Sequence, residues 1–141
     1  MIYNKKIFIT GGAGFIANTL IKHYVENNKI VVYDNFHRDT LTGSSIANHP
    51  NIMIIKGDVL DFELLKTSMA GVDVVIHAAG IAGIDTVIKN PVHTMRVNMI
   101  GTSNALEAAR KQGNISPFLA FMYQQYAKFL KKEIRAMQKT N

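Results

Sequence analysis

A glycine-rich segment near the start of the chain constrains the fold more than any other feature. Residues 10–17, Thr-Gly-Gly-Ala-Gly-Phe-Ile-Ala, join an apolar stretch, Lys6–Thr10, to a run of helical periodicity, Ala13–Asn28. Glycines at a strand-to-helix turn let the backbone approach a phosphate closely, and the helix N-terminus adds free N–H groups and a positive dipole end. The pattern alone is weak evidence, because a tight turn without a ligand explains it equally well.

Apolar runs of strand length alternate with helical patterns along the rest of the chain, which is typical of βαβ units around a parallel sheet. The predicted strands are Lys6–Thr10, Ile30–Asp34, Ile52–Lys56 and Val72–Ala78. The predicted helices are Ala13–Asn28, one that Asp61 caps with Leu64, Leu65 and Met69 inward, and Pro91–Lys111 with Val97, Ile100, Leu106 and Ala109 inward. The segment 36–50 is predicted as a loop with at most one short helix. We therefore expect an α/β, Rossmann-type sheet of about four strands, ordered 3-2-1-4, with helices on both faces.

The final segment differs from the rest in charge and pattern. The chain carries a net charge of +6, but residues 1–117 hold eleven Lys and Arg against nine Asp and Glu, so most of the excess belongs to residues 118–141. Apolar residues from Phe118 to Met137 recur at helical spacing, which predicts a basic amphipathic helix. We expect an incomplete dinucleotide-binding domain over 1–117, ending before a fifth strand, and an atypical helical tail over 118–141. The balanced charge of the main domain argues against nucleic-acid binding.

An acidic residue stands where a dinucleotide site needs one. Asp34 ends the second predicted strand, at the spacing after the glycines where a carboxylate accepts hydrogen bonds from ribose hydroxyls. Its charge disfavours a 2′-phosphate, which predicts NAD rather than NADP. Arg38, slightly downstream, is the feature that would favour NADP. An Asp that merely caps the following loop explains neither the strand end nor the spacing.

Four landmarks occur together in the right order between Ile7 and about Gly113. They are the turn 10–17; Tyr33-Asp34-Asn35-Phe36; Gly57-Asp58-Val59; and His77-Ala78-Ala79-Gly80, followed by Asn98-Met99-Ile100-Gly101-Thr102. In these the chain resembles the N-terminal part of the extended short-chain dehydrogenase/reductase family, among its NAD-dependent nucleotide-sugar epimerases and dehydratases. The family has a third glycine where this chain has Ala17, which is still small enough for helix to pack on strand.

The resemblance implies NAD as the cofactor and a set of residues that bind it. Asp58 and Val59 would contact the adenine, Ala78, Ala79 and Gly80 would line the middle and the nicotinamide side, and Asn98 would support the site or brace helix to strand. The implied cofactor-binding set is Gly11, Gly12, Ala13, Gly14, Phe15, Ile16, Asp34, Asn35, Asp58, Val59, Ala78, Ala79, Gly80 and Asn98. His77 is expected to be a packed neutral imidazole.

The catalytic residues of the resembling enzymes have no counterpart in this sequence. Their chemistry uses a Ser or Thr after the fifth strand and a Tyr followed four residues later by Lys, which lowers the phenol's pKa. Here Tyr123 is followed at that offset by Ala127, and Tyr126 by Leu130. We therefore expect no catalytic residue, no metal site and no turnover from this chain, with a nucleotide-sugar substrate only in a full-length relative. The tail is either a genuine terminus or a frameshift product, because codons for residues 121–125 read one base earlier permit Tyr-Val-Ser-Thr; the DNA sequence decides.

Composition sets the remaining expectations. Cysteine is absent, no export signal is visible and no apolar run approaches the length of a membrane helix, so we expect a soluble, cytoplasmic protein without a membrane partner. Self-association into a homo-oligomer is left open. Two other functions compete with the NAD-binding fragment: a non-catalytic NAD-sensing module whose tail helix meets a partner, and an S-adenosylmethionine binder of methyltransferase type. Calorimetric titration with NAD, NADP and S-adenosylmethionine separates the methyltransferase-type binder from the two NAD-binding functions.

Overall fold

The computed structural model describes residues 2–112, 119 and 120, and within them five strands form one parallel sheet. The strands are β1 (Lys6–Thr10), β2 (Lys29–Asp34), β3 (Ile52–Lys56), β4 (Val74–His77) and β5 (Leu119–Ala120). Their order across the sheet is β3-β2-β1-β4-β5. The predicted order 3-2-1-4 and the Rossmann-type arrangement are therefore confirmed.

The expectation that the chain stops before a fifth strand is wrong. Leu119 and Ala120 pair in parallel with Ile76 and His77 on the outer side of β4. A strand of two residues leaves almost no trace in a sequence, and here it lies at the start of a longer run of helical periodicity that masks it. The rest of the predicted tail helix, residues 121–141, and the boundary at 117 lie outside the described residues.

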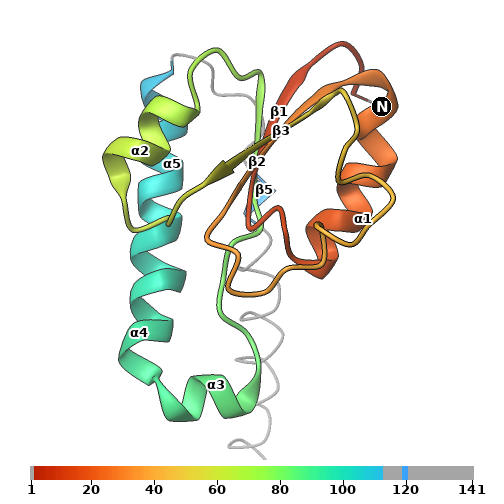
Figure 1. Ribbon diagram of the computed structural model, residues 1–141. Coiled ribbons are helices and arrows are strands. Elements are labelled where there is room, and N and C mark those ends of the chain that lie inside the picture. The colour runs from red at the N-terminus through yellow and green to blue at the C-terminus, as the bar shows by residue number, and fades with distance from the viewer. Residues whose placement is uncertain (1, 113–118, 121–141) are drawn as a thin grey trace, which may run out of the picture.

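Helices cover both faces of the sheet, as predicted. On one face lies α1 (Phe15–Tyr24), continued by a 3-10 turn (η1, Val25–Asn27); on the other lie α2 (Phe62–Ser68) and α5 (Gly101–Lys111) (Figure 1). Ile7 and Ile9 of β1 pack in the core under α1, whereas Phe8 packs in the core under α2 and α5. Each such side chain, once fully buried, contributes roughly 1.5–3 kcal/mol. Because β1 and β2 are buried on both faces, their sequences are apolar almost throughout.

The segment after β4 is more helical than predicted. The segment between β4 and the expected helix, where no helix was predicted, contains α3 (Ile84–Lys89). The expected helix Pro91–Lys111 is one continuous helical run built from α4 (Pro91–Met95), a π-helical turn (η2, Arg96–Ile100) and α5. In the segment 36–50 the described chain forms turns and no helix. α3 and α4 extend past the edge of the sheet at which the strands end (Figure 1).

Some positions predicted to face the core are exposed. Val97 and Ala109 are buried, but 47% of Ile100 and 53% of Leu106 are exposed. The π turn adds a residue to one turn of the helix and so changes which face the following residues occupy. In α2, Leu65 and Met69 are buried as predicted, whereas 38% of Leu64 is exposed.

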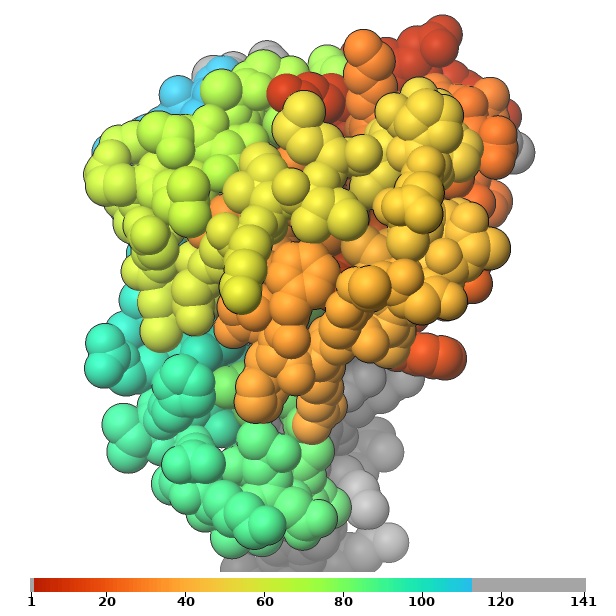
Figure 2. Space-filling model, viewed as in Figure 1, coloured from red at the N-terminus to blue at the C-terminus, as the bar shows by residue number. Residues whose placement is uncertain are grey.

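β3 forms one edge of the described sheet. Met53 and Ile54 are 58% and 46% exposed, and Figure 2 shows β3, in yellow, at the molecular surface.

None of the described helices combines the length and the apolar composition needed to cross a bilayer.

Candidate functional site

The segments that follow the strands meet at one edge of the sheet, the edge formed by the carboxyl ends of the strands. The glycine turn follows β1, Asp34 ends β2, residues 57–59 follow β3 and residues 78–80 follow β4. In an open parallel sheet, ligands bind at this edge, where the strand order changes direction. All predicted site residues except Asn98 lie on these four segments.

The glycine turn brings the end of β1 against the segment that follows β4. Gly11 has a φ of +66°, and a Cβ atom added there would lie 2.5 Å from the backbone nitrogen of Ala79. Gly14 then begins α1, and no side chain caps this helix. The first N–H groups of a helix have no partner inside it, so the uncapped turn offers hydrogen-bond donors to an anion. Two side chains of that first turn are open to solvent, with 79% of Phe15 and 41% of Ile16 exposed.

Asp34 lies beside the glycine turn, held by two backbone amides. Its Oδ2 accepts a hydrogen bond from the N–H of Ala13 at 3.0 Å, and its Oδ1 accepts one from the N–H of Phe36 at 2.7 Å. The residue is 9% exposed. Burial raises the pKa of Asp34, and the two amide hydrogen bonds partly oppose that shift. Each carboxylate oxygen retains a lone pair for a further donor.

The loop after β2 is fastened to the glycine turn. The backbone N–H and the hydroxyl of Thr40 both donate to the carbonyl of Ala13, at 2.8 and 2.9 Å. The buried Asn18 donates from Nδ2 to the carbonyl of Thr40 at 2.7 Å. Phe36 has a φ of +61°, a strained backbone for a bulky residue and the kind of strain that gathers at functional sites. Sequence reasoning missed Thr40 and Asn18, because no local pattern shows a contact between loop and turn.

The segment after β3 is fixed from three sides. The hydroxyl of the fully buried Tyr33 donates to the carbonyl of Asp58 at 2.9 Å, and the Asp58 carboxylate accepts from the N–H of Leu60 at 2.9 Å. Asn104 of α5 donates to the carbonyl of Val59 at 3.0 Å. Burial, the largest cause, and the nearby charges of Asp61 and Asp58 raise the pKa of Tyr33 to about 12. Tyr33 is thus a neutral support for this segment.

A chain of hydrogen bonds links the glycine turn to the helical run. Thr10 Oγ1 lies 2.6 Å from His77 Nδ1, and His77 Nε2 lies 3.0 Å from Thr102 Oγ1. Thr102 donates its own proton to the carbonyl of Asn98 at 2.6 Å, so it accepts from His77, whose proton is therefore assigned to Nε2. His77 is fully buried, and desolvation lowers its pKa to about 4. The expected packed, neutral imidazole is what the structure has.

Asn98 lies in the π-helical turn η2 and not on one of the segments that directly follow the strands. From there it braces the segment after β4. Its Oδ1 accepts from the N–H of Ile81 at 2.8 Å, and its Nδ2 donates to the carbonyl of Ile81 at 3.0 Å. Both polar ends of the side chain are therefore engaged with one backbone unit. Of the two roles expected for Asn98, the geometry is that of the brace.

The buried His77 predicts a loss of stability in acid. Its pKa is lower in the folded chain, about 4, than the ordinary value of 6.5, so the unfolded chain binds more protons between these values. The free energy of unfolding therefore has its full value, as far as His77 is concerned, above pH 6.5 and decreases as the pH falls towards 4. His77→Gln removes the titration, so between pH 7 and pH 4 the wild type should lose roughly 3 kcal/mol more unfolding free energy than this variant.

Urea unfolding at a series of pH values measures this difference. Asp34 has a raised pKa and therefore acts in the opposite direction in both proteins, which is why the comparison with the variant is needed. The control is His23→Gln, the same substitution on the exposed surface of α1. Equal pH dependence in the wild type and His77→Gln would show that His77 is not a buried neutral group.

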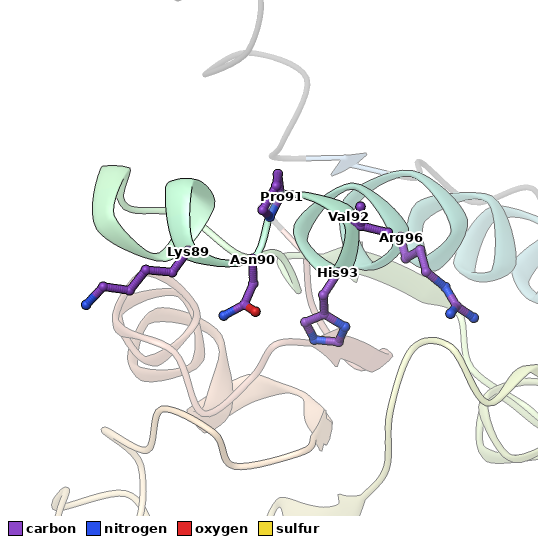
Figure 3. A pocket seen from close by; sticks show the side chains of 6 residues that line it. All are labelled: Lys89, Asn90, Pro91, Val92, His93 and Arg96. Carbon is purple, nitrogen blue, oxygen red and sulfur yellow. The ribbon is translucent and has the colours of Figure 1, made fainter.

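A separate hollow of about 400 Å³ lies where α3 meets α4. It is lined by Lys89, Asn90, Pro91, Val92, His93 and Arg96. Figure 3 shows Lys89, Asn90 and His93 extending on one side of the helical run and Pro91 and Val92 on the other. All six residues are exposed, and none belongs to the predicted site. In the part of the chain that the structure describes, no three His, Cys, Asp or Glu side chains gather as metal ligands would.

Comparison with known proteins decides the family. The model of the 3-beta hydroxysteroid dehydrogenase/isomerase family matches residues 8–124, from β1 past β5. The chain belongs to this family. An inverting UDP-N-acetylglucosamine 4,6-dehydratase of Campylobacter jejuni is 35% identical over 116 residues, covering 79% of this chain and 35% of that enzyme. The resemblance to nucleotide-sugar epimerases and dehydratases is thereby confirmed.

Solved structures of related enzymes share the fold. A UDP-N-acetylglucosamine 4-epimerase from Methanobrevibacter ruminantium, in complex with UDP-N-acetylmuramic acid, has a TM-score of 0.74 and 25% identity, covering 80% of this chain and 36% of that one. The Bordetella bronchiseptica enzyme WbmH, in complex with NAD⁺, has a TM-score of 0.68 and 28% identity, covering 79% of this chain and 37% of its own. The 141-residue chain spans about a third of the length of the relatives it matches.

Proposed function

We propose that this chain binds NAD at the edge formed by the glycine turn, Asp34 and residues 78–80, as the cofactor-binding part of a nucleotide-sugar epimerase or dehydratase. The observation that carries the proposal is the buried Asp34 carboxylate, which the N–H of Ala13 ties to the turn where the uncapped α1 begins. A hydrogen-bond acceptor for the ribose hydroxyls and a set of hydrogen-bond donors for the phosphates thus lie side by side. NAD, when bound, supplies transient hydride transfer; the chain's own residues bind and orient it.

Each part of the edge fits one part of the dinucleotide. The first turn of α1 fits the pyrophosphate, and the free lone pairs of Asp34 fit the hydroxyls of the adenosine ribose. Asp58 and Val59 fit the adenine, while Ala78, Ala79 and Gly80 fit the middle and the nicotinamide side. Asn98 would act through the segment that it braces. The remaining members, Gly11, Gly12, Ala13, Phe15, Ile16 and Asn35, shape the turn and the loop beside it.

Asp34 provides the test of this proposal. Asp34→Asn keeps the size of the side chain but loses its charge, so NAD should bind about 10-fold more weakly or worse, the cost of removing a charged hydrogen-bond partner. NADP should lose less, because the repulsion of its 2′-phosphate disappears as well. Calorimetric titration with both cofactors measures the two changes.

A matched control exists at the opposite edge of the sheet. The Asp73 carboxylate also accepts a backbone N–H, that of Lys6 at 2.8 Å, but it precedes β4 and lies far from the proposed site. Asp73→Asn should bind NAD as the wild type does. Equal losses in the two variants, or no loss in Asp34→Asn, would remove Asp34 from the site.

The catalytic part of the proposal rests on the sequence, and the assembly part rests on exposed apolar side chains. No Tyr in the 141 residues is followed four positions later by Lys, so we propose that this chain supplies the cofactor side of the reaction and not the acid–base side. Self-association is supported by exposed apolar side chains of α3, α4 and η2, namely Ile84, Ile88, Val92, Met95 and Met99. The NAD-sensing alternative depends on the tail, residues 118–141, and gains no support from the described residues.

A further inference from the structure

One side chain crosses the edge where the cofactor is proposed to bind. Arg38 belongs to the loop between β2 and β3, yet its guanidinium donates to the carbonyl of Ala82, after β4, at 3.3 Å. In the sheet, β1 stands between β2 and β4. A hydrogen bond from the loop after β2 to the segment after β4 therefore spans the end of β1, which is the position of the glycine turn.

The backbone on both sides of this crossing is held in place. Two residues after Arg38, Thr40 donates twice to the carbonyl of Ala13 in the glycine turn. On the other side, Asn98 holds the N–H and the carbonyl of Ile81, the residue before Ala82. The guanidinium also lies close to Gly83, where an added Cβ atom would be 3.7 Å from the same nitrogen. In Figure 2 the orange loop after β2 reaches the green segment after β4. The crossing is thus a defined feature of the edge.

The charge of Arg38 is not neutralised by the residues around it. Within the described residues its guanidinium is exposed and pairs with a neutral carbonyl, at the long end of the hydrogen-bond range. The adjacent Asp39 carboxylate instead accepts the N–H groups of Leu41 and Thr42, and the Thr42 hydrogen bonds hold the pKa of Asp39 below its usual range. A cation beside the positive end of α1 is unfavourable by itself. An anion placed between the two would be stabilised by both.

We propose that Arg38 is a clasp for the pyrophosphate of the bound dinucleotide. The guanidinium exchanges the Ala82 carbonyl for phosphate oxygens and closes the loop over the group that the first turn of α1 holds from the other side. The inference rests on the proposed function and adds a residue to it. A charge-assisted hydrogen bond to phosphate is roughly twice as strong as the neutral one it replaces.

This role differs from that of an arginine that selects NADP. The ribose that carries a 2′-phosphate in NADP is proposed to lie at Asp34, which ends β2, and the adenine beyond it at β3. Arg38 extends in the opposite direction, across β1 towards β4. It therefore meets the middle of the dinucleotide, which NAD and NADP share.

Titration of the full chain with adenosine, ADP, NAD and NADP tests the clasp. Arg38→Gln should weaken ADP, NAD and NADP by the same factor, about 10-fold or more, and leave adenosine unchanged. Arg38→Lys keeps the charge but not the planar fork of the guanidinium, so its affinities for ADP, NAD and NADP should lie between those of Arg38→Gln and the wild type. The matched control is Arg96→Gln, which removes the same charge from the exposed hollow of Figure 3 and should bind all four as the wild type does.

Other outcomes overturn the clasp in recognisable ways. A loss confined to NADP would make Arg38 a 2′-phosphate reader, and an equal loss for adenosine would show a damaged fold. If the wild type binds NAD and Arg38→Gln binds it equally well, the clasp fails while the proposed function stands. If the wild type does not bind NAD, the proposed function itself fails.

Discussion

Replacement of Gly11 by Ala is expected to lower the free energy of unfolding by about 3–5 kcal/mol, at the upper end of what single substitutions cost. Two separate causes act at this position. The φ of +66° is unfavourable for any residue with a Cβ, and the added atom would overlap the backbone of Ala79 at 2.5 Å. Backbone cannot move aside as a flexible side chain can, so the turn and the segment after β4 would have to separate.

Two other glycines isolate these causes. Gly71 has the same φ of +66° but open space around it, so Gly71→Ala should cost only about 1–2 kcal/mol. Gly43 has no positive φ, and no other described residue comes within 4 Å of an added Cβ, so Gly43→Ala should be nearly neutral. Urea unfolding followed by circular dichroism measures all three. A loss at Gly11 no larger than that at Gly71 would mean that the close approach to Ala79 does not exist.

Replacement of Gly14 by Val is expected to reduce NAD affinity on the order of 100-fold or more while the chain stays folded, because the pyrophosphate would lose two charge-assisted hydrogen bonds. Gly14 has a φ of −77°, which any residue adopts. Among the described residues, and apart from its two chain neighbours, the one atom within 4 Å of an added Cβ is the carbonyl oxygen of Gly11 at 3.1 Å, a tight contact that a shift of a few tenths of an ångström relieves. The space that a valine would fill is therefore the open space over the first turn of α1.

The control for this change is Gly43→Val, the same substitution in an open position of the loop after β2. It should bind NAD as the wild type does. Calorimetry gives the affinities, and thermal unfolding verifies that both variants keep the fold. Unchanged NAD affinity in a folded Gly14→Val protein would place the cofactor away from the glycine turn.

Features of the fold that depend on local pattern were predictable from the sequence. The bounds of β1 and β3 agree with the predicted strands, and Asp61 caps α2 by accepting the N–H of Leu64 at 3.1 Å. A run of apolar residues of strand length or a capping carboxylate leaves its signal within a few residues. The π turn at Arg96–Ile100 and the two-residue β5 leave none, because both are determined by packing against distant elements.

The same division holds for the candidate site. The glycine turn and Asp34 carry a spacing that a ligand imposes, so sequence could place them at one edge. The contacts of Thr40 with Ala13 and of Arg38 with Ala82 join residues 27 and 44 positions apart, and no sequence period connects them. For His77 the apolar strand around it was enough to predict a neutral imidazole. The partners of His77 come from two tertiary contacts: the pairing of β1 with β4 supplies Thr10, and the packing of α5 on β4 supplies Thr102.

Calorimetric titration of the complete 141-residue chain with NAD and with NADP tests most directly whether this edge is a dinucleotide site. The geometry around Asp34 predicts saturable binding of NAD at one site, with NADP weaker by about 10-fold or more because its 2′-phosphate would face a buried carboxylate. Absence of NAD binding by the folded chain, or equal affinity for the two cofactors, would contradict it.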